Sequence, residues 1–205
     1  MNRYGRQVVT LGLLLALSLT SLSCAGEDQA PRLDGKRVVM VVGADGFRDE
    51  ELEEPRSILE SYGADVSVAC SRPGPARGML GGTAEPDLLL EDVDVEEFDA
   101  LVFVGGAGAR EYWDDPVAHA LARKAIAGGK VVAAICLAPV TLARAGLLKG
   151  KRATVYPSER GRIEEAGARY VEAEVVVEGK VITASGPQAA SAFGKAIAKA
   201  LAEPQ

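Results

Sequence analysis

Cys136 is the residue of this 205-residue chain that is best placed to do chemistry. It ends a run of small and β-branched apolar residues, VVAAIC at 131–136, and the segment 138–148 that follows is typical of a helix. The pattern predicts a buried parallel strand, a sharp turn and a helix. A thiol at such a turn lies at the carboxyl edge of the sheet, where backbone N–H groups and the helix dipole favour the thiolate. An inert buried cysteine is the alternative from this segment alone.

The only histidine, His119, does not lie near this cysteine in the sequence. It is expected within a helix, as a surface or packing residue. A Cys-His-acid triad therefore cannot be assembled from one chain, and peptide or glutamine hydrolysis, which must protonate a leaving amine, is disfavoured. Cys70 ends another apolar run and is expected to be simply buried.

The elements that position Cys136 alternate between strands and helices. This order predicts an α/β fold with an open, mostly parallel sheet covered on both faces. Ligands in such sheets bind beyond the carboxyl ends of the strands, where the loop after the first strand, Gly105-Gly106 and Cys136 would meet. The expected strands are 37–42, 65–70, 100–104, 131–135 and 153–155, the helices 49–62, 116–127, 138–148, 159–166 and 189–201, and the hairpins 80–93 and 172–183.

The first 24 residues are typical of a secretory signal, with a basic start and an apolar stretch at 8–22. Cys24 suggests a lipoprotein site, which would anchor an exported chain in the cell envelope, at the periplasmic face or the cell surface; ordinary cleavage after Ala25 is the alternative. Residues 25–35 would form a tether and residues 36–203 one domain. The net charge of −6 and the absence of a basic block argue against nucleic-acid binding.

Several motifs in a fixed order resemble the ThiJ/PfpI superfamily, which is related to class I glutamine amidotransferases. They cover most of the chain after the tether. The resemblance implies a flavodoxin-like three-layer sandwich with a nucleophile-elbow cysteine, usually a homodimer, and no cofactor. The motifs are ADGFRDEELEEP (44–55), DALVFVGGAGAREY (99–112), AAICLAP (133–139), LARAGLLKGKRATVYPS (142–158) and AEVVVEGKVITASGP (173–187). GGAGAR fails as a dinucleotide fingerprint, since Glu111 stands where a third glycine is needed.

The resemblance also implies the site. Cys136 would be the nucleophile and Glu51 the carboxyl that hydrogen-bonds it, with the backbone N–H groups of Gly106 and Leu137 as oxyanion donors. The expected pocket residues are Gly105, Arg48 and Tyr156. The other acidic residues around Glu51 are expected to stabilise a helix N-terminus, and no metal site is expected, since no His or Cys is interleaved with them.

The departures from the family pattern limit the reactions that the site is expected to catalyse. Leu137 and Tyr156 stand where relatives carry histidines, Arg48 stands where the protease-like branch has a glutamate, and Ala138 replaces a glycine. A Cys-Glu pair can still attack an aldehyde or 2-oxoaldehyde and convert it to a 2-hydroxy acid, which is glutathione-independent glyoxalase or deglycase-type chemistry. The alternative is a non-catalytic thiol redox sensor or binding module. A PfpI-type cysteine peptidase ranks below both.

Overall fold

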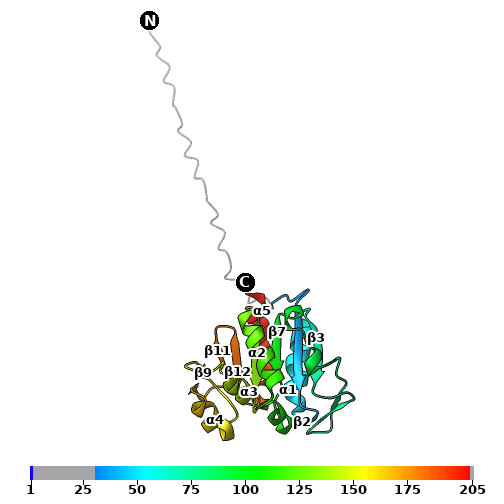
Figure 1. Ribbon diagram of the computed structural model, residues 1–205. Helices are drawn as coiled ribbons and strands as arrows, with labels where there is room; N and C mark the ends of the chain where they lie inside the picture. The colour runs from blue at the N-terminus through cyan, green and yellow to red at the C-terminus, as the bar shows by residue number, and fades with distance from the viewer. Residues whose placement is uncertain (2–30, 204–205) are drawn as a thin grey trace.

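The computed structural model describes Met1 and residues 31–203, which form a three-layer α/β sandwich (Figure 1). Its central sheet has seven strands in the order β11-β12-β8-β7-β1-β3-β6, and all neighbours pair in parallel except β11 with β12. This confirms the flavodoxin-like fold class. The strands are β1 (Arg37–Val42), β3 (Asp65–Cys70), β6 (Leu88–Leu89), β7 (Ala100–Phe103), β8 (Val131–Ile135), β11 (Val175–Glu178) and β12 (Val181–Ala184).

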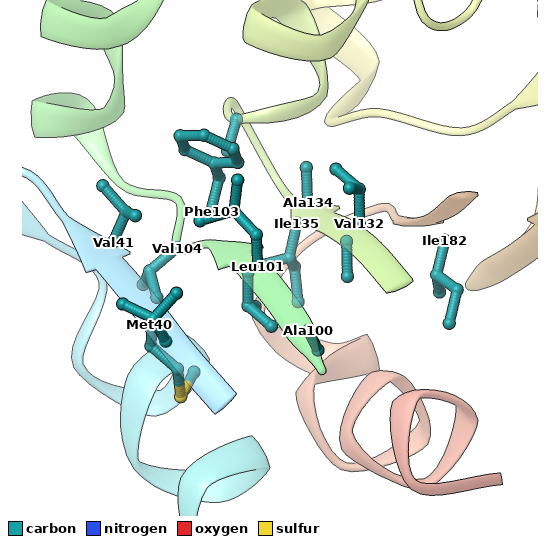
Figure 2. Close-up of a cluster of buried hydrophobic side chains, with 14 of the residues drawn as sticks. Met40, Val41, Ala100, Leu101, Phe103, Val104, Val132, Ala134, Ile135 and Ile182 are labelled. Atoms are coloured by element: carbon teal, nitrogen blue, oxygen red, sulfur yellow. The ribbon is translucent and has the colours of Figure 1, made fainter. Parts of the chain in front are cut away.

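The central strands are apolar along their whole length because helices cover both faces of the sheet. Figure 2 shows the resulting core, in which side chains from β1, β7, β8 and β12 lie side by side. Met40, Leu101 and Ile135 are at most 1% exposed. This packing holds the strand ends in register, and the site lies at their carboxyl edge.

Two helices cover each face. α1 (Asp49–Ser61) packs against α5 (Ala190–Ala202) on one face, while α2 (Pro116–Ala127) and α3 (Pro139–Arg144) cover the other (Figures 1 and 2). α1 and α5 approach closely at Gly194, where a Cβ would lie 2.8 Å from the Cα of Pro55. α4 (Arg160–Glu165) packs beside α3.

The hairpin expected at 80–93 is wrong in extent. The hairpin instead pairs β4 (Ala76–Gly78) with β5 (Thr83–Ala84), and β2 (Asp45–Phe47) joins β4 to make a separate three-stranded sheet. β6 belongs to the central sheet, because the Asp87 carboxylate accepts a hydrogen bond from Val68 N–H at 2.8 Å and binds this segment to β3. The predicted alternation did not reveal this long-range pairing.

The helix after Cys136 is shorter than the expected 138–148. α3 ends at Arg144, and Gly146 then adopts a φ of +84°, a left-handed conformation that commonly ends helices. The hairpin of β11 and β12 agrees with the expected 172–183. The remaining elements are β9 (Arg152–Ala153), β10 (Arg169–Tyr170) and 3-10 turns at Leu90–Asp92, Val95–Glu97, Ala107–Tyr112, Pro157–Glu159 and Pro187–Ala189.

The predicted signal peptide after Met1, the predicted lipidation site Cys24 and the predicted tether up to residue 30 lie outside the described residues. Within residues 31–203, no helix combines the length and the apolar character that crossing a bilayer requires.

Candidate active site

Cys136 sits on a strained turn between β8 and α3. Its φ of 62° makes it the only non-glycine residue with a positive φ in the described part of the chain. Such a conformation costs about 1–3 kcal/mol and persists only where the surroundings impose it. Here the Cys136 N–H donates to the Ala184 carbonyl and the Cys136 carbonyl accepts from Tyr156 N–H, both at 2.9 Å. The predicted elbow is therefore present, and neighbouring strand and loop residues hold it in place.

Glu51 is a fully buried carboxyl at the third residue of α1. Its side chain is 0% exposed, and neither carboxyl oxygen has a hydrogen-bond partner of normal geometry among the described residues. The thiol of Cys136 and the N–H of Gly105 both lie close enough to lower the pKa of Glu51 in part. A buried carboxyl without a structural partner is costly, so a role in chemistry is the better explanation of this residue.

Two glycines after β7 allow the carboxyl and the thiol to meet. A Cβ on Gly105 would overlap Glu51 Oε2 and lie 2.5 Å from the Cβ of Cys136. Gly106 has a φ of 94°, and a Cβ there would overlap the backbone of Gly46 and Arg48. Both positions therefore require glycine for close approach of chain segments from β2, α1 and β8.

The pKa values of the pair are raised for one main reason, loss of solvation. Burial raises the pKa of Glu51 to about 7. Burial also raises the pKa of Cys136 to about 12, and the charge of Glu51 adds to this, while the N–H groups of Gly106 and Leu137 act to lower it. Protonation of Glu51 removes its repulsion. The pKa of the thiol then falls toward its ordinary value, although burial still holds it up; the N–H of Gly105 acts on Glu51 in the same way and lowers its pKa.

Cys136 opens into a cavity of about 450 Å³ at the carboxyl edge of the sheet. Five of the predicted site residues line this cavity: Cys136, Leu137, Gly106, Arg48 and Tyr156. Glu51 and Gly105 do not line it and lie directly behind the thiol. The lining residues are Arg48, Met79, Gly106, Ala107, Arg110, Cys136, Leu137, Tyr156, Ser158, Pro187 and Gln188.

Arg48 and Tyr156 both line the cavity, but their contacts differ. Arg48 pairs with its neighbour Glu50 through two hydrogen bonds of 2.8 and 3.0 Å. Tyr156 is 43% exposed and packs its ring against Gly186 at the cavity rim. His119 is half-buried on α2, its Nε2 lies 2.9 Å from the Trp113 carbonyl oxygen, and it does not line the cavity.

The sequence reasoning missed the side chains that the β4–β5 hairpin and the 3-10 turns at 107–112, 157–159 and 187–189 bring to the cavity. Arg110 stands within the GGAGAR motif itself, and its cationic side chain was the one signal that could have marked it. Met79 and Ser158 carried no local signal. Among residues 31–203, no cluster of three or more His, Cys, Asp or Glu side chains has the arrangement of a metal site.

The chain thus combines a flavodoxin-like sandwich with a cysteine at a strand-to-helix turn and a buried glutamate beside it. Residues 36–200 match the DJ-1/PfpI family, and the chain belongs to that family. It is 39% identical over 204 residues to protein MJ0967 of Methanocaldococcus jannaschii, covering 98% of each chain. It is 38% identical to Deglycase TK1284 of Thermococcus kodakarensis, covering 73% of this chain and 90% of the relative.

Two further comparisons agree with this assignment. The chain is 27% identical to the glutathione-independent glyoxalase DJR-1.2 of Caenorhabditis elegans, covering 83% of this chain and 91% of the relative. The crystal structure of a ThiJ/PfpI domain protein from Brachyspira murdochii superposes with a TM-score of 0.79 at 36% identity, covering 82% of this chain and 98% of that chain.

Proposed function

We propose that this chain is a cysteine-dependent enzyme that acts on reactive carbonyl compounds, of the glutathione-independent glyoxalase or deglycase type. Cys136 is the nucleophile and Glu51 the acid and base. The observation that carries the proposal is the fully buried Glu51 carboxyl, which has no structural partner and faces the elbow thiol behind an open cavity. Relatives named deglycase and glyoxalase support the same chemical class.

The first half of the reaction is addition of sulfur to an aldehyde. Glu51 takes the thiol proton, and the Cys136 thiolate forms a C–S bond with the aldehyde carbon. The carbonyl oxygen becomes negative, is stabilised by the N–H groups of Gly106 and Leu137, and receives the proton from Glu51. The product is a neutral hemithioacetal, and no amine leaves, so no histidine is needed.

The second half is an internal redox step. Glu51 removes the hydrogen of the former aldehyde carbon as a proton and returns a proton to the adjacent ketone carbon through an enediol. The first carbon becomes a thioester and the second an alcohol, so no external oxidant or reductant takes part. Water then hydrolyses the thioester and releases a 2-hydroxy acid and the free thiol of Cys136. The pKa of about 7 for Glu51 suits a group that both accepts and donates protons near neutral pH.

Methylglyoxal consumption and lactate formation by the purified full-length chain test this proposal. Wild type is expected to form lactate, Cys136→Ser none, and Cys70→Ser as much as wild type. Absence of lactate from wild type, with Cys136 still open to alkylation at neutral pH, would overturn the glyoxalase activity.

A thiol redox sensor is the second candidate, favoured by the lack of a histidine among the lining residues and by the N–H groups of Gly106 and Leu137, which act to lower the pKa of Cys136. Peroxide would oxidise the thiolate to a sulfenate and then a sulfinate, with water as the reduced product. The amides of Gly106 and Leu137 and protonated Glu51 would hold the acid oxygens. Selective oxidation of Cys136 by peroxide, in a chain without turnover, would select this role.

The cellular setting is also a proposal. The chain is exported and anchored in the cell envelope through a lipid on Cys24, and it acts as a homodimer. Labelled fatty acid is expected to enter wild type and not Cys24→Ser in a bacterial host with a lipoprotein pathway. Light scattering of the detergent-solubilised chain measures its mass, and a monomer would contradict the dimer.

A further inference from the structure

The two arginines that line the cavity are in different electrostatic states. Arg48 is neutralised by Glu50, which accepts hydrogen bonds from its Nε and Nη2 atoms. The guanidinium of Arg110 donates no hydrogen bond to any residue in the described part of the chain, and its side chain is 56% exposed. The lining residues include no carboxylate. Arg110 is therefore the cation that the cavity offers to a ligand.

The nearest carboxylate, Glu159, is already engaged by other groups. Its Oε2 accepts from Arg162 Nε at 2.7 Å and its Oε1 accepts from the Ser158 hydroxyl at 3.0 Å. Arg110 Nη2 lies 3.6 Å from Oε1, too far for a hydrogen bond. Glu159 therefore attracts Arg110 without using its N–H donors.

A stack of arginines on one indole positions Arg110. The guanidinium carbons of Arg110, Arg144 and Arg162 lie 5.4, 5.5 and 5.0 Å from the ring centre of Trp113. The indole Nε1 donates to the Leu137 carbonyl at 3.0 Å, which joins the stack to the residue next to the nucleophile. Within the described residues these three guanidiniums form ion pairs with two carboxylates, Asp114 with Arg144 and Glu159 with the other two, so Arg110 and Arg162 share one partner.

We infer that Arg110 is a specificity-determining residue and that the enzyme prefers 2-oxoaldehydes that carry an anionic group, a carboxylate or a phosphate, at the end away from the aldehyde. This inference rests on the proposed function, since it names the substrate class of the same site. A planar guanidinium with free N–H donors binds such a group in bidentate fashion. With the anion held at Arg110, the aldehyde end of the substrate is directed toward Cys136, which lines the same cavity.

Alkylation of Cys136 tests the anion site without requiring turnover. Iodoacetate and iodoacetamide have the same reacting carbon, and with each the thiolate forms an S–CH2 bond while iodide leaves; only iodoacetate carries a carboxylate. In the full-length chain, the ratio of iodoacetate to iodoacetamide rates at Cys136, followed by peptide mass spectrometry, is expected to fall about tenfold in Arg110→Gln. An equal ratio in wild type and Arg110→Gln would overturn the inference.

Arg37→Gln is the matched control. Arg37 also pairs with a carboxylate, Glu97 at 3.3 Å, and also stacks on a ring, Phe98 at 5.0 Å, but it begins β1 at the opposite edge of the sheet from the site. It loses the same charge and is expected to leave the ratio unchanged. A tenfold fall in Arg37→Gln would show that net charge, and not Arg110, sets the preference.

Turnover separates this inference from the proposed function. The ratio of kcat/KM for 4,5-dioxopentanoate over methylglyoxal is expected to exceed one and to fall about tenfold in Arg110→Gln. Turnover of both with no response to Arg110→Gln would overturn the inference alone; no turnover of either, with an alkylation ratio that responds, would overturn the function alone. Protection of Cys136 from iodoacetate by acetate would assign the anion as a carboxylate, and protection by inorganic phosphate as a phosphate ester; protection by neither would count against the site.

Discussion

Cys70 and Cys136 occupy comparable places in the sheet, yet only one has the surroundings of a nucleophile. Both lie at the carboxyl ends of parallel strands, and they are 0% and 7% exposed. Cys70 is the last residue of β3 and pairs in register with Val42 and Leu89. Cys136 has left its strand, adopts a left-handed backbone and faces a cavity.

The difference shows that the end of a strand does not by itself make a cysteine reactive. What distinguishes Cys136 is a turn that lifts the thiol out of the ladder, a buried carboxyl behind it and two backbone amides facing it. The helix dipole contributes little, because α3 has only six residues. Local contacts at the elbow therefore set the surroundings of this thiol.

Removal of each thiol in turn gives the largest expected contrast. Cys136→Ser should lower kcat/KM for methylglyoxal by at least about a thousandfold, because the nucleophile is lost. Cys70→Ser should leave it unchanged within error. Lactate formation under initial-rate conditions measures both, and equal effects of the two substitutions would remove the distinction between the cysteines.

Removal of the Glu51 carboxyl, which distinguishes the surroundings of Cys136 from those of Cys70, should have the next largest effect. Glu51→Gln keeps the shape of the side chain but cannot exchange a proton, so kcat should fall by about a hundredfold or more. Glu54→Gln is the matched control, since Glu54 is an exposed carboxyl on the same helix. Similar losses in the two variants would show that general acidity of the segment, rather than Glu51, matters.

The buried carboxyl should also make stability depend on pH. The pKa of Glu51 is about 7 in the folded protein against a reference of 4.5, so the native state holds a proton that the unfolded state releases between these values. Stabilisation relative to Glu51→Gln is therefore fully present below pH 4.5 and lost as pH rises to 7, by about 3 kcal/mol. Urea unfolding of both chains at several pH values measures the difference, which should stay constant if Glu51 is charged throughout.

The glycine that lets the pair meet should tolerate no side chain. Gly105→Ala is expected to destabilise the fold by about 1–3 kcal/mol and to reduce turnover, because its Cβ would collide with Glu51 and Cys136. Gly161→Ala in α4 is the control: its Cβ would meet open space, and alanine favours the helix by about 0.5–1 kcal/mol. Thermal unfolding should show opposite signs for the two, and equal signs would contradict the assigned close approach.

The parts of the fold that local patterns encode were predictable. The apolar run into Cys136 predicted both β8 and the elbow, and the segment at 172–183 predicted the β11–β12 hairpin. The short strand β2 was not predicted, because it pairs with β4, about thirty positions along the chain, and is bridged to Gly106. Such pairing leaves little trace in the composition of three residues.

The features of the candidate site divide in the same way, into those that local motifs predict and those that only packing determines. The sequence by itself determined the elbow cysteine, the glycine pair after β7 and, through family motifs, the glutamate, since each lies in a short motif with local backbone demands. Only the tertiary structure decided that Arg48 is hydrogen-bonded to Glu50 while Arg110 donates no hydrogen bond within the described residues. It also decided that three arginines lie over Trp113 and that Glu159 accepts hydrogen bonds from Arg162 and Ser158. The physical reason is that charge balance depends on distances between side chains from separate elements, which packing of the three layers sets and no local pattern records.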